Sequence, residues 1–104
     1  MVSLTKNPEV IQKWFSMSIQ DQISNIGSEV LRADRWKQKG NHERMRTYYD
    51  TAISFLCLSI RDPKNAGGRN ELNLCIDELA DYFIGENLWG TTSETLKKYY
   101  NAFL

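Results

Sequence analysis

The chain has 104 residues, 41% hydrophobic and 25% charged, and its thirteen basic side chains balance thirteen acidic ones. This length predicts one domain with its own core, and the zero net charge gives no sign of a polyanionic partner. No apolar run reaches the roughly 18 residues of a membrane span, and the N-terminus lacks a secretory signal pattern. We therefore expect a cytoplasmic protein without a membrane segment.

Residues 1–16 carry the weakest helical signal. Asn7 and Pro8 can serve as the cap and first residue of a short helix, with Val10 and Ile11 on its apolar face. A flexible tail that docks only through Trp14 and Phe15 is an equally good interpretation. We treat residues 1–16 as an extension, either a short helix or flexible, and residues 17–104 as a single helical domain.

The first long helix is predicted over residues 18–39. Ser18 is a good N-cap, Gly40 is a natural C-terminal stop, and Gly27 beside the apolar stripe would let another helix approach closely. The stripe follows the helical repeat, with spacings of four, three, four and three residues. Its members are Ile19, Ile23, Ile26, Val30 and Ala33.

A second helix is predicted over residues 41–61, with Asn41 as its cap. Its apolar stripe is unusually wide, so we expect this helix to be buried on two sides. The connection to the preceding helix is so short that the two must be antiparallel neighbours. Asp62 and Pro63 end the second helix, and residues 64–68 are expected to form a flexible surface loop.

Two further helices are predicted over residues 70–84 and 91–104. Asn70 would cap the first and Gly85 would end it, whereas Thr91 and Glu94 form a capping box for the second. The four segments predict an all-α fold, an antiparallel bundle of three to four helices, with the short N-terminal helix as an optional addition.

Few residues suggest catalysis. The sequence has no phosphate-binding glycine loop and no Glu-x-x-His or Cys-x-x-Cys pair, and Cys57 and Cys75 fall in apolar helical patterns typical of reduced, buried thiols. We expect no metal and no cofactor.

One pair, Arg35 and His42, has six intervening residues and resembles the nuclease motif of HEPN proteins, small helical RNases. Here the pair would fall on two helices, and the alternative is a solvated hairpin tip.

Charge is unevenly distributed along the chain. From Glu71 to Glu86 there are five acids and no base, whereas residues 32–46 hold six basic side chains and His42. Three interpretations are open: the two segments are solvated faces, the basic segment contacts an acidic partner or the acidic helix of a second copy, or the basic segment binds RNA or DNA phosphates. Trp36 would then stack on bases or pack in the core. We call this segment the basic tip; it comprises Arg32, Arg35, Trp36, Lys37, Lys39, Arg44 and Arg46.

Aromatic residues are numerous, with three Trp, five Tyr and four Phe. A short terminal helix cannot bury all of its aromatic side chains on one face, and a surplus apolar face is typical of a subunit interface. We therefore expect a homo-oligomer, with a dimer as the simplest closed form, or a protein partner. The predicted interface residues are Trp89, Tyr99, Tyr100 and Phe103.

Several short segments resemble a group of small bacterial helical proteins described only as hypothetical. They are residues 14–19, 25–30, 35–37, 81–83 and 85–87. The resemblance implies a bacterial, cytosolic, all-helical domain and brings no catalytic residues with it. In architecture alone the chain is also similar to four-helix HEPN-like proteins. The sequence thus favours a non-enzymatic protein acting through protein–protein contact or self-association, with a HEPN-like nucleic-acid-binding or RNA-cleaving module as the alternative.

Overall fold

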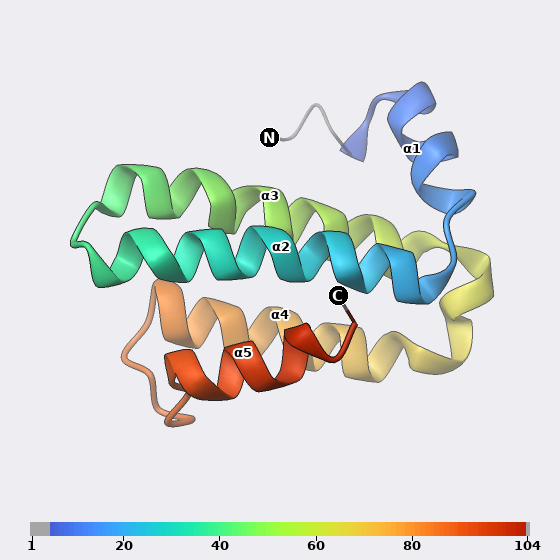
Figure 1. The fold of residues 1–104 in the computed structure, drawn as a ribbon. Helices are drawn as coiled ribbons and strands as arrows, with labels where there is room; N and C mark the ends of the chain where they lie inside the picture. The colour runs from blue at the N-terminus through green and yellow to red at the C-terminus, as the bar shows by residue number, and fades with distance from the viewer. Residues whose placement is uncertain (1–4, 104) are drawn as a thin grey trace.

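The computed structural model describes residues 5–103, which form helices joined by short connections and contain no strand. Residues 1–4 of the predicted N-terminal extension, and residue 104 of the last predicted helix, lie outside the described part. No helix among the described residues is both long and apolar enough to cross a lipid bilayer. In chain order the elements are α1 (Pro8–Phe15), α2 (Ile19–Gln38), α3 (His42–Arg61), the 3-10 helix η2 (Pro63–Gly68), α4 (Arg69–Phe83) and α5 (Ser93–Asn101) (Figure 1).

The long hairpin of α2 and α3 is the centre of the fold. The Ser18 hydroxyl accepts a hydrogen bond from the backbone of Asp21 at 3.1 Å and so caps α2, as expected. At the turn Gly40 has φ +75°, a conformation that favours glycine, and its N–H donates to the carbonyl of Lys37 at 3.0 Å. Asn41 then caps α3 by accepting from the backbone of Arg44 at 3.1 Å. Both helices lie within a residue of their predicted bounds.

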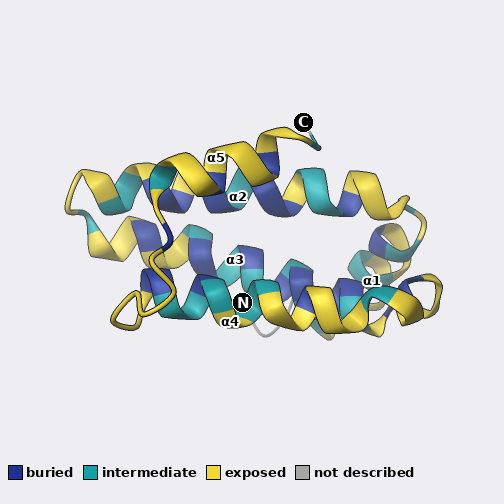
Figure 2. Cartoon of the chain, turned by 90° about the horizontal axis from the view of Figure 1, so that it is seen from below, coloured by how far each residue is buried: buried dark blue, intermediate teal, exposed yellow. Residues whose placement is uncertain are grey.

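α3 is the helix that contacts most of its neighbours, because it packs against α1, α2 and α4. Its wide apolar stripe therefore faces more than one helix, as the sequence predicted. Figure 2 shows the buried residues on the facing sides of the helices and the exposed residues on the outside. The core side chains of α2, α3, α4 and α5 are Ile26, Val30, Ala33, Met45, Tyr49, Ala52, Leu56, Leu58, Leu72, Leu79, Tyr82, Phe83, Leu96 and Tyr100.

The N-terminal segment forms the short helix α1 instead of a flexible tail. Asn7 caps it, and Trp14 is only 3% exposed. The indole ring of Trp14 stacks on Phe55 with ring centroids 4.4 Å apart, and its N–H donates to the Ser59 hydroxyl at 3.0 Å. A buried tryptophan with a satisfied N–H is a strong anchor, so α1 is held against α3.

The segment 64–68, predicted as a flexible surface loop, is part of η2 and is tied to the core. Asn65 is buried, and its amide donates to the side-chain oxygen of Gln22 at 2.8 Å and to the carbonyl of Ser59 at 2.9 Å. The prediction failed because the buried amide of Asn65 holds this glycine-rich segment in place. Its partner Gln22 lies more than forty residues earlier in the chain, so the sequence around Asn65 does not reveal the contact.

Two predicted helix caps were also wrong. α4 begins at Arg69 with Gly68 in the cap position and no side-chain cap, so Asn70 lies inside the helix. α5 begins at Ser93 and is capped by Thr92 with Thr95, instead of by Thr91 with Glu94. Thr91 is buried, and its hydroxyl donates to Glu78 at 2.8 Å. This hydroxyl therefore bonds to α4 instead of capping α5.

Candidate functional site

The shortness of α5 leaves part of the fold uncovered. α5 has 9 residues, whereas α2, on which it packs, has 20. In Figure 1 α5 lies along the half of α2 that leads to the hairpin turn and does not reach the half next to α1. The two helices touch where Tyr100 covers Gly27, since a Cβ at Gly27 would lie 3.0 Å from the Cβ of Tyr100.

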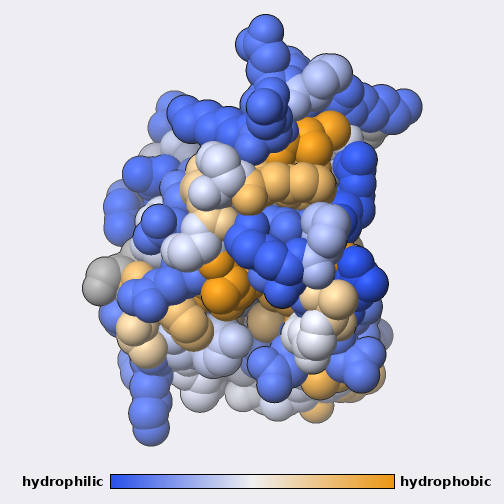
Figure 3. All heavy atoms as spheres, turned by 90° about the vertical axis from the view of Figure 1, so that its right-hand side faces the viewer, coloured by the Kyte–Doolittle hydropathy of each residue, from blue (hydrophilic) through white to orange (hydrophobic). Residues whose placement is uncertain are grey.

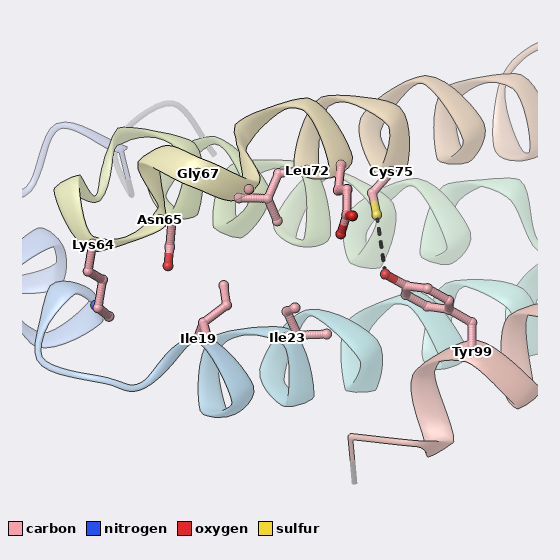
Figure 4. Close-up of a pocket in the computed structure, with 10 residues that line it drawn as sticks. Ile19, Ile23, Lys64, Asn65, Gly67, Leu72, Cys75 and Tyr99 are labelled. Atoms are coloured by element: carbon pink, nitrogen blue, oxygen red, sulfur yellow. Dashed lines mark hydrogen bonds between the residues drawn. The ribbon is translucent and has the colours of Figure 1, made fainter.

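A groove of about 280 Å³ opens beside the end of α5. It runs between α2 on one side and η2 and α4 on the other, and Tyr99 of α5 closes one end (Figure 4). Figure 4 shows Ile19 and Ile23 pointing from α2 towards η2 and α4. We call this the apolar groove; its lining residues are Ile19, Ile23, Lys64, Asn65, Gly67, Gly68, Glu71, Leu72, Cys75 and Tyr99.

The reactive-looking side chains of the apolar groove are uncharged at neutral pH. Burial raises the pKa of the Cys75 thiol and raises the pKa of Tyr99 to about 12. The two groups face each other, with the sulfur 3.9 Å from the phenol oxygen. Among the described residues, the charged side chains that line the groove are Lys64 and Glu71, which have opposite signs. An apolar channel with a few polar groups at its edge is suited to binding.

The predicted interface aromatics occupy different environments. Tyr99 is 46% exposed and Trp89 is 53% exposed, whereas Tyr100 is 2% exposed and belongs to the core. Phe103 is half-buried; its ring is 5.7 Å from that of Tyr99, and both border a shallow apolar hollow beyond the groove. Tyr100 is buried because Gly27 lets it approach α2, so only three of the four residues are available to a partner.

Exposed aliphatic residues were missed by the sequence analysis. Leu88 is 80% exposed and lies beside Trp89 in the connection between α4 and α5, coloured as exposed over most of its length in Figure 2. This connection is ordered, because the carboxylate of Asp81 accepts hydrogen bonds from the backbones of Leu88 at 2.8 Å and Trp89 at 3.0 Å. The sequence did carry a sign of this exposure, because Leu88 and Trp89 lie in a turn segment outside any helical apolar stripe.

Two members of the basic tip are paired within their own helices. Arg32 lies 3.0 Å from Glu29 and Arg46 lies 2.9 Å from Asp50. Both are i,i+3 or i,i+4 pairs on the surface, as expected for solvated helix faces. These two cations are therefore partly neutralised.

Trp36 is covered by cations of the same chain. Lys39 lies 4.8 Å and Arg44 4.7 Å from the centre of its ring, and the ring is half-buried. Lys37 lies 5.0 Å from the centre of the Tyr82 ring. Stacking of a nucleic-acid base on Trp36 would have to displace these contacts.

Arg35 and His42 are not joined by any hydrogen bond among the described residues. Both are exposed; Arg35 lines a cleft between α2 and α5, and His42 is the first residue of α3. Within the described part of the chain, no group of three or more His, Cys, Asp or Glu residues is placed to hold a metal ion.

Seen from the end that carries α1 and η2, the surface shows small apolar patches between hydrophilic side chains (Figure 3).

Comparison of the chain with protein-family models, with curated proteins and with solved structures gave no match.

Proposed function

We propose that this chain is an incomplete antiparallel four-helix bundle of the cytosol that acts through protein–protein contact, without catalysis. The observation that carries the proposal is the apolar groove left by the short helix α5. In a complete bundle a fourth helix of full length would cover Ile19 and Ile23. Here Ile19 remains 40% exposed, and the ring of Tyr99 at the other end of the groove is 46% exposed.

A second copy of the chain is the occupant that we favour. Tyr99, which closes one end of the groove, also lines the hollow beside Phe103, so its ring borders apolar surface on both sides. Glu71 and Lys64, whose ammonium also contacts the Asp62 carboxylate of its own chain, give the edge of the groove opposite charges, so a twofold axis can bring the Lys64 of one copy near the Glu71 of the other. Burying such a surface between two copies removes it from water.

Sedimentation velocity over a range of concentrations tests this proposal with two matched variants. Ile19→Asp places a charge in the groove, and an acidic residue in the first turn of α2 is compatible with the helix dipole, so the monomer should still fold. We expect dimerisation to weaken about tenfold or more. Leu88→Asp removes a more exposed apolar side chain outside the groove and should leave the dimer unchanged.

Two results would contradict the proposal. A wild-type chain that remains monomeric at the highest soluble concentration excludes a second copy as the occupant. Loss of the dimer in Leu88→Asp but not in Ile19→Asp moves the interface to the connection between α4 and α5.

Nucleic-acid binding or RNA cleavage by a HEPN-like module has less support. Arg32 and Arg46 are paired with acids, and Trp36 is in contact with two cations of its own chain. Arg35 faces α5 and has no hydrogen bond to His42 among the described residues. Arg35→Ala should therefore have no effect on cleavage of RNA by the purified protein.

A further inference from the structure

A second hollow lies on the other side of α5. It is a cleft of about 420 Å³ between the C-terminal half of α2 and α5. Lys97 lines this cleft, whereas Tyr99 lines the apolar groove. Because residues two apart on a helix point in nearly opposite directions, the two hollows lie on opposite sides of α5. The cleft is therefore separate from the proposed interface.

Three cations face this cleft from two helices. Arg35 and Lys39 are four residues apart on one face of α2, and Lys97 lies on the facing side of α5. None of the three forms an ion pair with an acid among the described residues; the ammonium of Lys39 lies over the ring of Trp36. Like charges on the two walls of a cleft concentrate positive potential there.

The uncharged polar side chains of the cleft are Gln38 from α2 and Ser93 and Asn101 from α5. The amide nitrogen of Gln38 donates to the Ser93 hydroxyl at 3.1 Å, which joins the two walls. Ser93 is the first residue of α5, so the positive end of that helix dipole also lies at the cleft. Glu94, the acid of this first turn, is exposed and does not line the cleft.

One carboxylate, Asp34, also borders the cleft, but it is engaged by the fold. It is 3% exposed and accepts hydrogen bonds from the Tyr82 hydroxyl at 2.5 Å and from Gln38 at 3.2 Å. Burial raises the pKa of Tyr82 to about 12, so the phenol stays protonated and continues to donate. Asp34 thus balances one of the three cations, and an excess of positive charge remains at the opening.

We infer that the cleft between α2 and α5 binds an oligophosphate group through Arg35, Lys39 and Lys97. Arginine offers a planar fork that matches two phosphate oxygens, and each lysine offers a compact charge. Three cations on opposite walls suit a chain of two or three phosphates better than a single monoanion. None of the described residues that line the cleft is aromatic, so recognition rests on the phosphates and not on a base.

Isothermal titration calorimetry at low ionic strength tests this inference with inorganic tripolyphosphate, ATP and adenosine as probes. Tripolyphosphate and ATP should bind with similar affinity, adenosine should not bind, and added salt should weaken both complexes. Lys97→Gln and Arg35→Gln should each weaken binding about tenfold. Lys98→Gln, a neighbouring exposed lysine that does not line the cleft, should change the affinity less than twofold.

Circular dichroism and the melting temperature establish that each variant is folded. Absence of tripolyphosphate binding to the folded wild-type protein overturns the inference. Equal losses in Lys97→Gln and Lys98→Gln would also overturn it, because they indicate diffuse surface charge without a defined cleft. Binding of single-stranded RNA without binding of tripolyphosphate would replace it with a nucleic-acid surface.

Discussion

At the scale of single residues, the buried carboxylate of Asp62 joins α2, α3 and η2. It is 3% exposed, accepts from the side-chain amide of Gln22 at 2.9 Å and from the backbone of Lys64 at 3.1 Å, and contacts the ammonium of Lys64. Burial alone would raise the pKa of this carboxyl, but the hydrogen bonds from Lys64 and Gln22 outweigh it and hold the pKa below its ordinary value.

This lowered pKa predicts a specific acid sensitivity. A carboxyl whose pKa is lower in the folded than in the unfolded chain contributes stability that is complete above about pH 4 and is lost as the pH falls further. Asp62→Asn should cost about 1–3 kcal/mol at neutral pH, and the deficit should shrink in acid. Urea unfolding at several pH values measures both effects, with Asp77→Asn on the exposed face of α4 as the control. A deficit that is constant with pH would show that the Asp62 charge is not involved.

At the scale of elements, the position of α5 depends on the close approach at Gly27. A Cβ there would lie 3.0 to 3.3 Å from three atoms of the Tyr100 side chain, which is itself buried. The sequence suggested that Gly27 admits a neighbouring helix, but it could not say which one. The partner comes from the other end of the chain, and only the packing of Tyr100 identifies it.

Gly27→Ala should therefore destabilise the fold by about 1–3 kcal/mol, because the added methyl group forces the Tyr100 ring or the whole of α5 to shift. Gly67→Ala is the matched control, since a Cβ at Gly67 meets nothing within 4 Å. Thermal unfolding followed by circular dichroism compares the two variants. If both have the wild-type melting temperature, α5 is free to move and the close contact does not hold it.

At the scale of the whole molecule, the helices could be predicted because their signals are local. The stripe from Ile19 to Ala33 and the stop at Gly40 are read within a few turns, and each end of α2 lies within one residue of its predicted position. The apolar groove and the cationic cleft could not be predicted, since each needs residues from distant segments. Lys97 was overlooked because its neighbours in the cleft, Arg35 and Lys39, lie about sixty residues earlier in the chain.

The uncovered groove also predicts how the stability of the whole molecule depends on concentration. If folded chains pair through it and unfolded chains do not, mass action favours the folded state as the protein becomes more concentrated. For a domain of this size, a tenfold increase in concentration should raise the melting temperature by roughly 3 °C. Differential scanning calorimetry of the wild type and of Ile19→Asp measures this dependence directly.

Ile19→Asp separates pairing from folding, because the substituted side chain is the first residue of α2 and is partly exposed already. Its melting temperature should be independent of concentration and should meet that of the wild type at high dilution, where both chains are monomers. A wild-type melting temperature that does not change with concentration would mean that the groove stays open in solution. A mutant that melts lower at every dilution would instead assign Ile19 to the stability of the monomer.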